Sequence, residues 1–149
     1  IGLRTETQGS PVDEFNLHPR LASDCHPLGD LSLSTVLLLN DSRYPWVILV
    51  PRRPDIREIY QLAAADREIL LEESCRVGQF MMKAFRGEKL NVGALGNLVP
   101  QLHLHQVVRN STDPAWPGPV WGHSTAVPYG REMLVERTRI LREGLSLAG

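Results

Sequence analysis

The sequence predicts one domain that combines β-strands with helices and contains an antiparallel strand pair. Two apolar, β-branched runs, at 34–40 and 46–50, are separated by a short turn-rich link, which favours antiparallel pairing. Apolar residues recur at helical spacing along 64–85, and 129–147 can also form a helix with one apolar face. The 149 residues show no internal repeat and no domain boundary, so these elements are expected to share one core.

Composition excludes several classes of protein. The apolar fraction of 42% and the charged fraction of 22% are those of an ordinary globular protein. A net charge of -1 argues against a nucleic-acid partner. No apolar run reaches the length of a membrane span, and the first residues lack the layout of a signal peptide. Cys25 and Cys75 fit no zinc or redox pattern, so we expect reduced thiols in a cytoplasmic protein, with Cys75 in the core.

The first third of the chain leads up to the strand pair. Residues 1–13 are polar and are expected to form a loose N-terminus. Residues 21–30 contain proline and glycine and are predicted to be a loop. The strands at 34–40 and 46–50 are almost continuously apolar, which is typical of strands covered on both faces.

The longest predicted helix, 64–85, has acidic residues near its start and basic residues near its end, as the helix dipole favours. Its apolar stripe is expected to consist of Ile69, Leu70, Val77, Phe80, Met81, Ala84 and Phe85. A third strand is predicted at 89–93 and a fourth at 100–109. The segment 110–128 is rich in proline and tryptophan, so we expect an ordered loop that packs on the core, a partner or a ligand. A C-terminal helix is predicted at 129–147.

The stretch 96–109 begins as a glycine-containing loop and continues into the fourth strand. Side chains alternate between the two faces of a strand, and one face here is apolar. The other face carries Gln101, His103, His105, Val107 and Arg109. Because buried polar groups are costly unless they are bonded, this polar row is expected to serve a function. For Arg109 a ligand contact and a surface or dimer ion pair are both open.

Several chemistries use two histidines that are two positions apart on a strand. Such a pair can bind a metal ion, although no third ligand lies near it in this sequence. It can act as a general acid or base, or one neutral imidazole can attack phosphorus. The alternative without chemistry is a pair of structural histidines. Attack on phosphorus would need an acceptor for the second imidazole nitrogen and amide donors for the phosphate oxygens, which 93–98 would supply.

The segment 96–105, Gly-Asn-Leu-Val-Pro-Gln-Leu-His-Leu-His, resembles the signature of the histidine triad (HIT) family. The family pattern is a Gly-Gln loop followed by three histidines that alternate with apolar residues. The Asn-Val-Gly at 91–93 and the strand pair that ends in Pro-Arg-Arg at 51–53 are also similar to family features. The resemblance covers roughly residues 34–109.

The resemblance implies an α+β fold of HIT type, with helices packed on a mainly antiparallel sheet, and usually a homodimer that shares a larger sheet. It also implies a site for a purine nucleotide and catalysis through a nucleotidyl-histidine intermediate, with no cofactor or metal required.

The resemblance also assigns roles to individual residues. Aligned on the motif, His103 takes the position of the nucleophile and His105 that of the histidine that supports the phosphate. Asn97, after Gly96 in the loop, stands where the family has the Gln that contacts the phosphate or the leaving group.

Two further asparagines are implied in nucleotide binding. Asn91 would hold the region of the α-phosphate. Asn40 falls near the ribose-contacting acidic position of the family, and Asp41 is the alternative for that role.

Gln101 departs from the family pattern because it replaces the first histidine of the triad. An amide donates and accepts hydrogen bonds but cannot take up a proton near neutral pH. If the first histidine protonates the leaving group, that role is lost or is passed elsewhere. The nucleophile is retained, and the rate and the choice of substrate are left open.

The sequence thus predicts a nucleotide hydrolase or nucleotidyl transferase that acts at the α-phosphate of a nucleoside monophosphate ester, anhydride or phosphoramidate. One alternative is a catalytically weak nucleotide-binding protein on the same fold. Another is a metal-dependent hydrolase with His103 and His105 as ligands.

Overall fold

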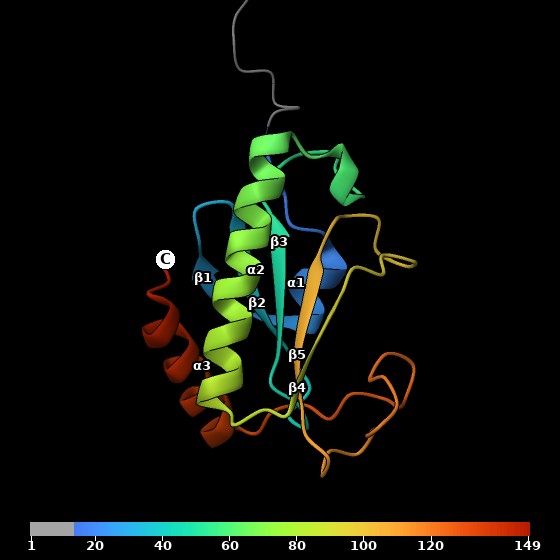
Figure 1. The fold of residues 1–149 in the computed structure, drawn as a ribbon, viewed down its shortest axis with the longest axis vertical. Helices are drawn as coiled ribbons and strands as arrows, with labels where there is room; N and C mark the ends of the chain where they lie inside the picture. Colours follow the sequence, from blue (N-terminus) through green and yellow to red (C-terminus); the bar gives the residue numbers. More distant parts are fainter. Residues whose placement is uncertain (1–13) are drawn as a thin grey trace, which may run out of the picture.

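The chain folds into one five-stranded antiparallel sheet with helices on both faces, as a computed structural model that describes residues 14–149 shows (Figure 1). The strands are β1 (Cys25–Asp30), β2 (Ser34–Leu39), β3 (Trp46–Pro51), β4 (Lys89–Gly93) and β5 (Leu104–Arg109), in the order β1-β2-β3-β5-β4. The α+β fold is confirmed, as is the antiparallel pairing of the two apolar runs. The predicted loose N-terminus, 1–13, lies outside the described residues.

Two helices cover one face of the sheet and lie side by side in Figure 1. They are α2 (Ala64–Ala84), which follows the short 3-10 turn η2 (Ile59–Gln61), and α3 (Arg131–Leu145). Both lie where helices were predicted. The short helix α1 (Pro19–Asp24) packs on the other face through Leu21. None of the helices within 14–149 has the length and apolar character needed to cross a membrane.

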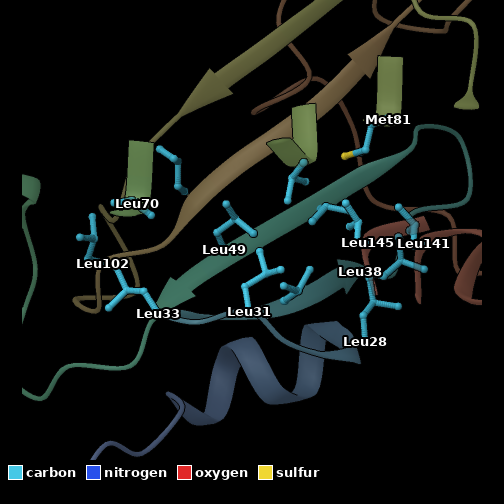
Figure 2. Packing of buried hydrophobic residues seen from close by; sticks show 14 of the residues in the cluster. Leu28, Leu31, Leu33, Leu38, Leu49, Leu70, Met81, Leu102, Leu141 and Leu145 are labelled. Carbon is cyan, nitrogen blue, oxygen red and sulfur yellow. The ribbon is translucent and has the colours of Figure 1, made fainter. Parts of the chain in front are cut away.

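The face under α2 and α3 is a largely aliphatic core. Figure 2 shows leucines of the strands meeting Leu70 and Met81 of α2 and Leu141 and Leu145 of α3. Gly78 on α2 allows close approach to the sheet, because a Cβ there would lie 2.5 Å from Leu90 Cδ2. We refer to this surface as the aliphatic face.

The apolar stripe of α2 was predicted only in part. The buried positions of α2 are Leu70, Glu73, Ser74, Val77, Gly78 and Met81, which recur at helical spacing. Ile69 is 37% exposed and Cys75 is exposed, so their predicted core positions are wrong. The small and polar residues Ser74 and Gly78 occupy that face instead, and hydrophobic periodicity does not reveal them.

The opposite face, which we call the aromatic face, is built from different residues. Its buried cluster includes Tyr44, Trp46, Ile48 and Val107 from the sheet region and Ala115 and Val120 from the segment 110–128. That segment is therefore packed against the core of its own chain.

Two predictions about strands and loops were wrong. β5 begins at Leu104 and not at Pro100, because proline lacks an N–H and the Leu102 N–H donates to Ile56 O outside the sheet. The predicted loop 21–30 contains the end of α1 and all of β1. β1 is an edge strand with an irregular register between Pro27 and Gly29, which is where a sheet tolerates these two residues.

Candidate active site

The two histidines of the polar row lie together on the aromatic face. His105 belongs to β5 and is paired with Ile48 of β3 on one side and Gly93 of β4 on the other. His103 comes immediately before the strand, and the two ring centroids are 4.9 Å apart. Both side chains are buried, at 6% and 8% exposure, so the direction of each ring nitrogen is set by its contacts inside the protein.

His103 is held through one ring nitrogen. Its Nδ1 lies 2.6 Å from the backbone oxygen of Gln101. A carbonyl oxygen can only accept a hydrogen bond, so Nδ1 must carry the proton. Nε2 then carries the unshared electron pair, and within residues 14–149 it has no hydrogen-bond partner. An imidazole held in this way has the geometry of a nucleophile or base.

His105 is held in the opposite tautomer. The indole Nε1 of Trp46, which can only donate, lies 3.0 Å from His105 Nδ1, so Nδ1 accepts and Nε2 carries the proton. Burial, assisted by the proximity of His103, lowers the pKa of His105 to about 3. His105 is therefore neutral and can donate a hydrogen bond from Nε2. Its ring neighbours the ring of His103.

Trp121 closes the aromatic surroundings of His105. Its ring lies edge-to-face with His105 at 5.6 Å and with Trp46 at 6.1 Å. It also sits over Gly93, where a Cβ would come within 3.3 Å of its ring. The segment 110–128 thus supplies one wall of the site, and Gly93 leaves the room that this wall occupies.

The loop before β5 offers unused hydrogen-bond donors next to His103. In the described part of the chain, no peptide N–H of residues 95–99 donates a hydrogen bond to another protein group. Gly96 has a φ of +68°, a conformation that glycine adopts without strain. The loop, His103 and Arg20 of α1 line a cavity of about 480 Å³. Free amides and a guanidinium beside the His103 imidazole are suited to an anionic group.

Gln101 contributes its backbone to His103 but turns its side chain elsewhere. Its Oε1 accepts from the His18 N–H at 2.8 Å, and its Nε2 donates to Asn16 O at 2.9 Å. The amide therefore fastens the N-terminal arm, residues 14–18, beside the site. Nothing in this arrangement replaces the imidazole that the resemblance would place at this position.

Arg109 and Asn91 belong to a hydrogen-bonded network farther along the same face of the sheet. Arg109 pairs with Asp113, at 2.7 Å from Nε to Oδ2, and donates to Asn91 Oδ1 at 2.9 Å. The guanidinium lies over the rings of Tyr44 and Trp116. The structure shows Arg109 in an ion pair within the chain, and because both side chains are buried, the predicted surface ion pair is wrong.

The structure does not bring Asn40 beside the histidines. Asn40 follows β2, and β3 lies between β2 and β5. Its Oδ1 accepts from the Tyr129 N–H at 3.0 Å and lies 3.1 Å from His26 Nε2. Asp41, the alternative, is buried and holds the Arg43 guanidinium.

Three residues of the site were not predicted from the sequence as functional. Trp46 was predicted only as part of a strand, Arg20 received no role, and Trp121 was part of a segment whose contacts were open. Trp46 and His105 are 59 positions apart, and Arg20 reaches the site from α1, so no local pattern connects them. Within residues 14–149, no group of three or more metal-ligating side chains is present.

Comparison with known proteins places the chain among histidine triad proteins. A family model described as HIT domain matches residues 20–112. A histidine triad protein from Marinobacter aquaeolei VT8 is 53% identical, with 89% of this chain and 97% of that chain covered and a TM-score of 0.87. One from Bradyrhizobium japonicum is 42% identical, with 88% and 98% covered and a TM-score of 0.86. The comparison with curated proteins returns no significant match.

Proposed function

Because this chain belongs to the HIT domain family, we propose that it is a nucleotide hydrolase or nucleotidyl transferase that forms a nucleotidyl intermediate on His103. HIT domain proteins generally bind nucleotides or act on them as hydrolases or transferases. One observation carries the proposal for this chain. The two histidines are held in opposite tautomers with their ring centroids 4.9 Å apart, so that one ring offers an unshared electron pair and its neighbour offers an N–H donor.

In the first step, Nε2 of His103 attacks the α-phosphorus of a nucleoside monophosphate ester, anhydride or phosphoramidate. A nitrogen–phosphorus bond forms, and the bond to the leaving group breaks with its electron pair on the leaving group. The imidazole becomes cationic, and its Nδ1–H remains donated to Gln101 O at 2.6 Å. That carbonyl dipole stabilises the positive charge that develops on the ring.

The negative charge on the transferred phosphoryl group requires donors that are already in place. His105 offers its Nε2–H, and the loop 95–99, with Gly96 and Asn97, offers peptide N–H groups that have no other described partner. Donors of this kind are effective because they need no rearrangement as the charge develops. In the second step, water attacks phosphorus, the bond to His103 breaks, and nucleoside monophosphate and a proton leave.

The remaining assignments follow from the family. We propose that Asn91 and Asn40 bind the nucleotide by donating hydrogen bonds from their side-chain NH₂ groups. These NH₂ groups have no described partner, whereas the side-chain oxygen of each residue already accepts a hydrogen bond. No cofactor or metal is needed for the steps above. We also propose a homodimer that extends the sheet, because β4 is an edge strand and its Val92 is 48% exposed.

The test is intact-mass spectrometry at neutral pH after mixing with nucleoside phosphoramidates, nucleoside aryl phosphates and dinucleoside polyphosphates, together with steady-state assays. We expect a nucleotidyl adduct or steady release of nucleoside monophosphate, and loss of both in His103→Ala. His123→Ala is the matched control, because His123 is exposed and its side chain bonds only to Ser124 among the described residues. Equal turnover by His103→Ala and wild type would refute the proposal.

The second candidate is a nucleotide-binding protein with little catalysis. The observation that favours it is Gln101, whose side chain is committed to the N-terminal arm. In that case, nucleoside monophosphate would raise the melting temperature while neither adduct nor turnover appears.

A further inference from the structure

The leaving group of this reaction departs with an electron pair, and its chemistry decides whether it needs a proton. An amine that leaves phosphorus must gain a proton, since the alternative is an amide anion. A phosphate or polyphosphate leaves as a stable anion. Efficient turnover of substrates with amine leaving groups therefore requires an acid beside the leaving group. Such an acid raises the rate by roughly 10²–10⁴-fold.

Neither partner of His103 in the motif is suited to supply that proton. Gln101 has no group that ionises near neutral pH, and its side chain is bonded to the backbone of Asn16 and His18. His105 is fixed by Trp46 as the neutral tautomer. To act as an acid it would first have to be protonated at Nδ1, which would bring the new proton against the indole N–H.

The cavity next to His103 holds no other acid. In the described part of the chain, its lining consists of His103, Arg20 and residues 95–99, and arginine stays protonated. Arg57 and Glu58 reach His103 only through a gap of about 10 Å³, too small for a leaving group. His18 lines a different cavity, which Gln101 borders but His103 does not.

Arg20 gives this cavity a positive charge suited to an anion. Its Nε lies 3.4 Å from Asp24 Oδ2, an exposed and weak pairing, and its two terminal nitrogens bond to no other described residue. The guanidinium comes from α1, whereas every other lining residue belongs to the loop or is His103. A phosphoryl group on the loop therefore has Arg20 across the cavity, where the next phosphate of a chain would lie.

We propose, given the nucleotidyl-histidine reaction above, that the substrates are nucleoside phosphoanhydrides whose phosphate leaving group is stabilised by Arg20, and that phosphoramidates are poor substrates. As the bond between His103 Nε2 and phosphorus forms, the anhydride P–O bond breaks and its electron pair stays on the bridging oxygen. The leaving phosphate takes no proton from the protein. The fork of guanidinium donors pairs with its oxygens.

The experiment compares three substrates that share one nucleoside and its α-phosphate: a p-nitrophenyl ester, a dinucleoside polyphosphate and an alkyl phosphoramidate. We expect kcat/KM for the phosphoramidate to be lower than for the other two by roughly 10²–10⁴-fold, the contribution of the missing acid. Arg20→Gln should lower kcat/KM for the polyphosphate by roughly 10–100-fold more than for the nitrophenyl ester, the range for a hydrogen bond to a charged group. Arg139→Gln, on the exposed side of α3, is the control.

Each other outcome is decisive. Turnover of the nitrophenyl ester that depends on His103 establishes the intermediate, so a fast phosphoramidate alongside it would overturn only the substrate class. Selective loss of that phosphoramidate activity in His18→Gln would identify His18 as the acid. An equal effect of Arg20→Gln on the ester and the polyphosphate would overturn the role of Arg20 at the leaving group. No turnover of any substrate would instead remove the proposed function itself.

Discussion

Different interactions stabilise the packing on the two faces of the sheet. The aliphatic face, under α2 and α3, is dominated by leucine, valine and methionine side chains that make non-directional contacts. The aromatic face contains Tyr44, Trp46, Trp121 and two histidines, and it also contains a buried ion pair between Arg109 and Asp113, with the Arg109 guanidinium over the Tyr44 ring. The two histidines, Arg109 and Asp113 are held there by specific hydrogen-bond partners.

This difference indicates that the contacts on the aromatic face determine the chemistry of the site, whereas those on the aliphatic face determine mainly stability. A leucine on the aliphatic face can be replaced by another apolar residue of similar volume at small cost. On the aromatic face, the tautomer of His105 depends on one indole N–H, and that of His103 on one carbonyl oxygen. We therefore expect substitutions on the two faces to separate loss of stability from loss of chemistry.

The largest effect on stability is expected from Asp113→Ala. Asp113 accepts two hydrogen bonds from Arg109 and three from the peptide N–H groups of Asn110, Ala115 and Trp116. Its removal leaves a buried guanidinium without its counter-ion, which should lower the free energy of unfolding by about 3–5 kcal/mol. Urea unfolding measures this change. Near-ultraviolet circular dichroism should also report a changed environment of Trp121.

Leu38→Ala is the matched control on the aliphatic face, where Leu38 is fully buried. It should lower the free energy of unfolding by about 2–5 kcal/mol, because a cavity remains, and should leave the tryptophan spectrum unchanged. A loss below about 1 kcal/mol in Asp113→Ala would mean that the ion pair does not hold the aromatic face together.

A smaller effect is expected from the titration of His105. Its folded pKa of about 3 lies below the ordinary value of 6.5, so between these values the unfolded chain binds a proton that the folded chain does not. Acid therefore favours unfolding, and stability that is present above pH 6.5 is lost as the pH falls. The linkage relation gives a loss of about 2 kcal/mol between pH 7 and pH 5.

His105→Gln isolates this contribution, because its amide oxygen can still accept from Trp46 but does not titrate. The difference in unfolding free energy between pH 7 and pH 5 should be smaller in this variant by about 2 kcal/mol. Equal pH dependence in both proteins would show that His105 is not held neutral.

The contrast between the faces also explains what the sequence could predict. The strands β2, β3 and β4 and the helices α2 and α3 follow from local patterns, and the motif identified His103 and His105. β1 was not predicted because its Pro27 and Gly29 are typical of loops. A strand tolerates them here only because β1 lies at the edge of the sheet and has an irregular register. Edge position is a property of the folded sheet.

The contacts that orient the site are long-range and so were beyond prediction. Trp46 and His105 are 59 positions apart, and Gln101 reaches Asn16 across 85 positions. Gln101 had been given a catalytic position from its place in the motif. Only the folded chain shows that the Gln101 backbone oxygen accepts a hydrogen bond from His103, whereas its side chain bonds to the N-terminal arm.

The smallest effect is expected where the aliphatic face contains its own polar pair. Gln106 donates to Ser74 of α2, and the other polar atom of its amide, Oε1, is buried without a described partner. Ser74→Ala alone leaves the amide unsatisfied and should cost about 1–3 kcal/mol. Ser74→Ala with Gln106→Leu removes both polar groups and fills the same volume, so its stability should lie within about 1 kcal/mol of wild type. A double-mutant cycle of urea unfolding measures both changes. A double variant less stable than Ser74→Ala would mean that the aliphatic face also depends on a directional hydrogen bond, as the aromatic face depends on its ion pair.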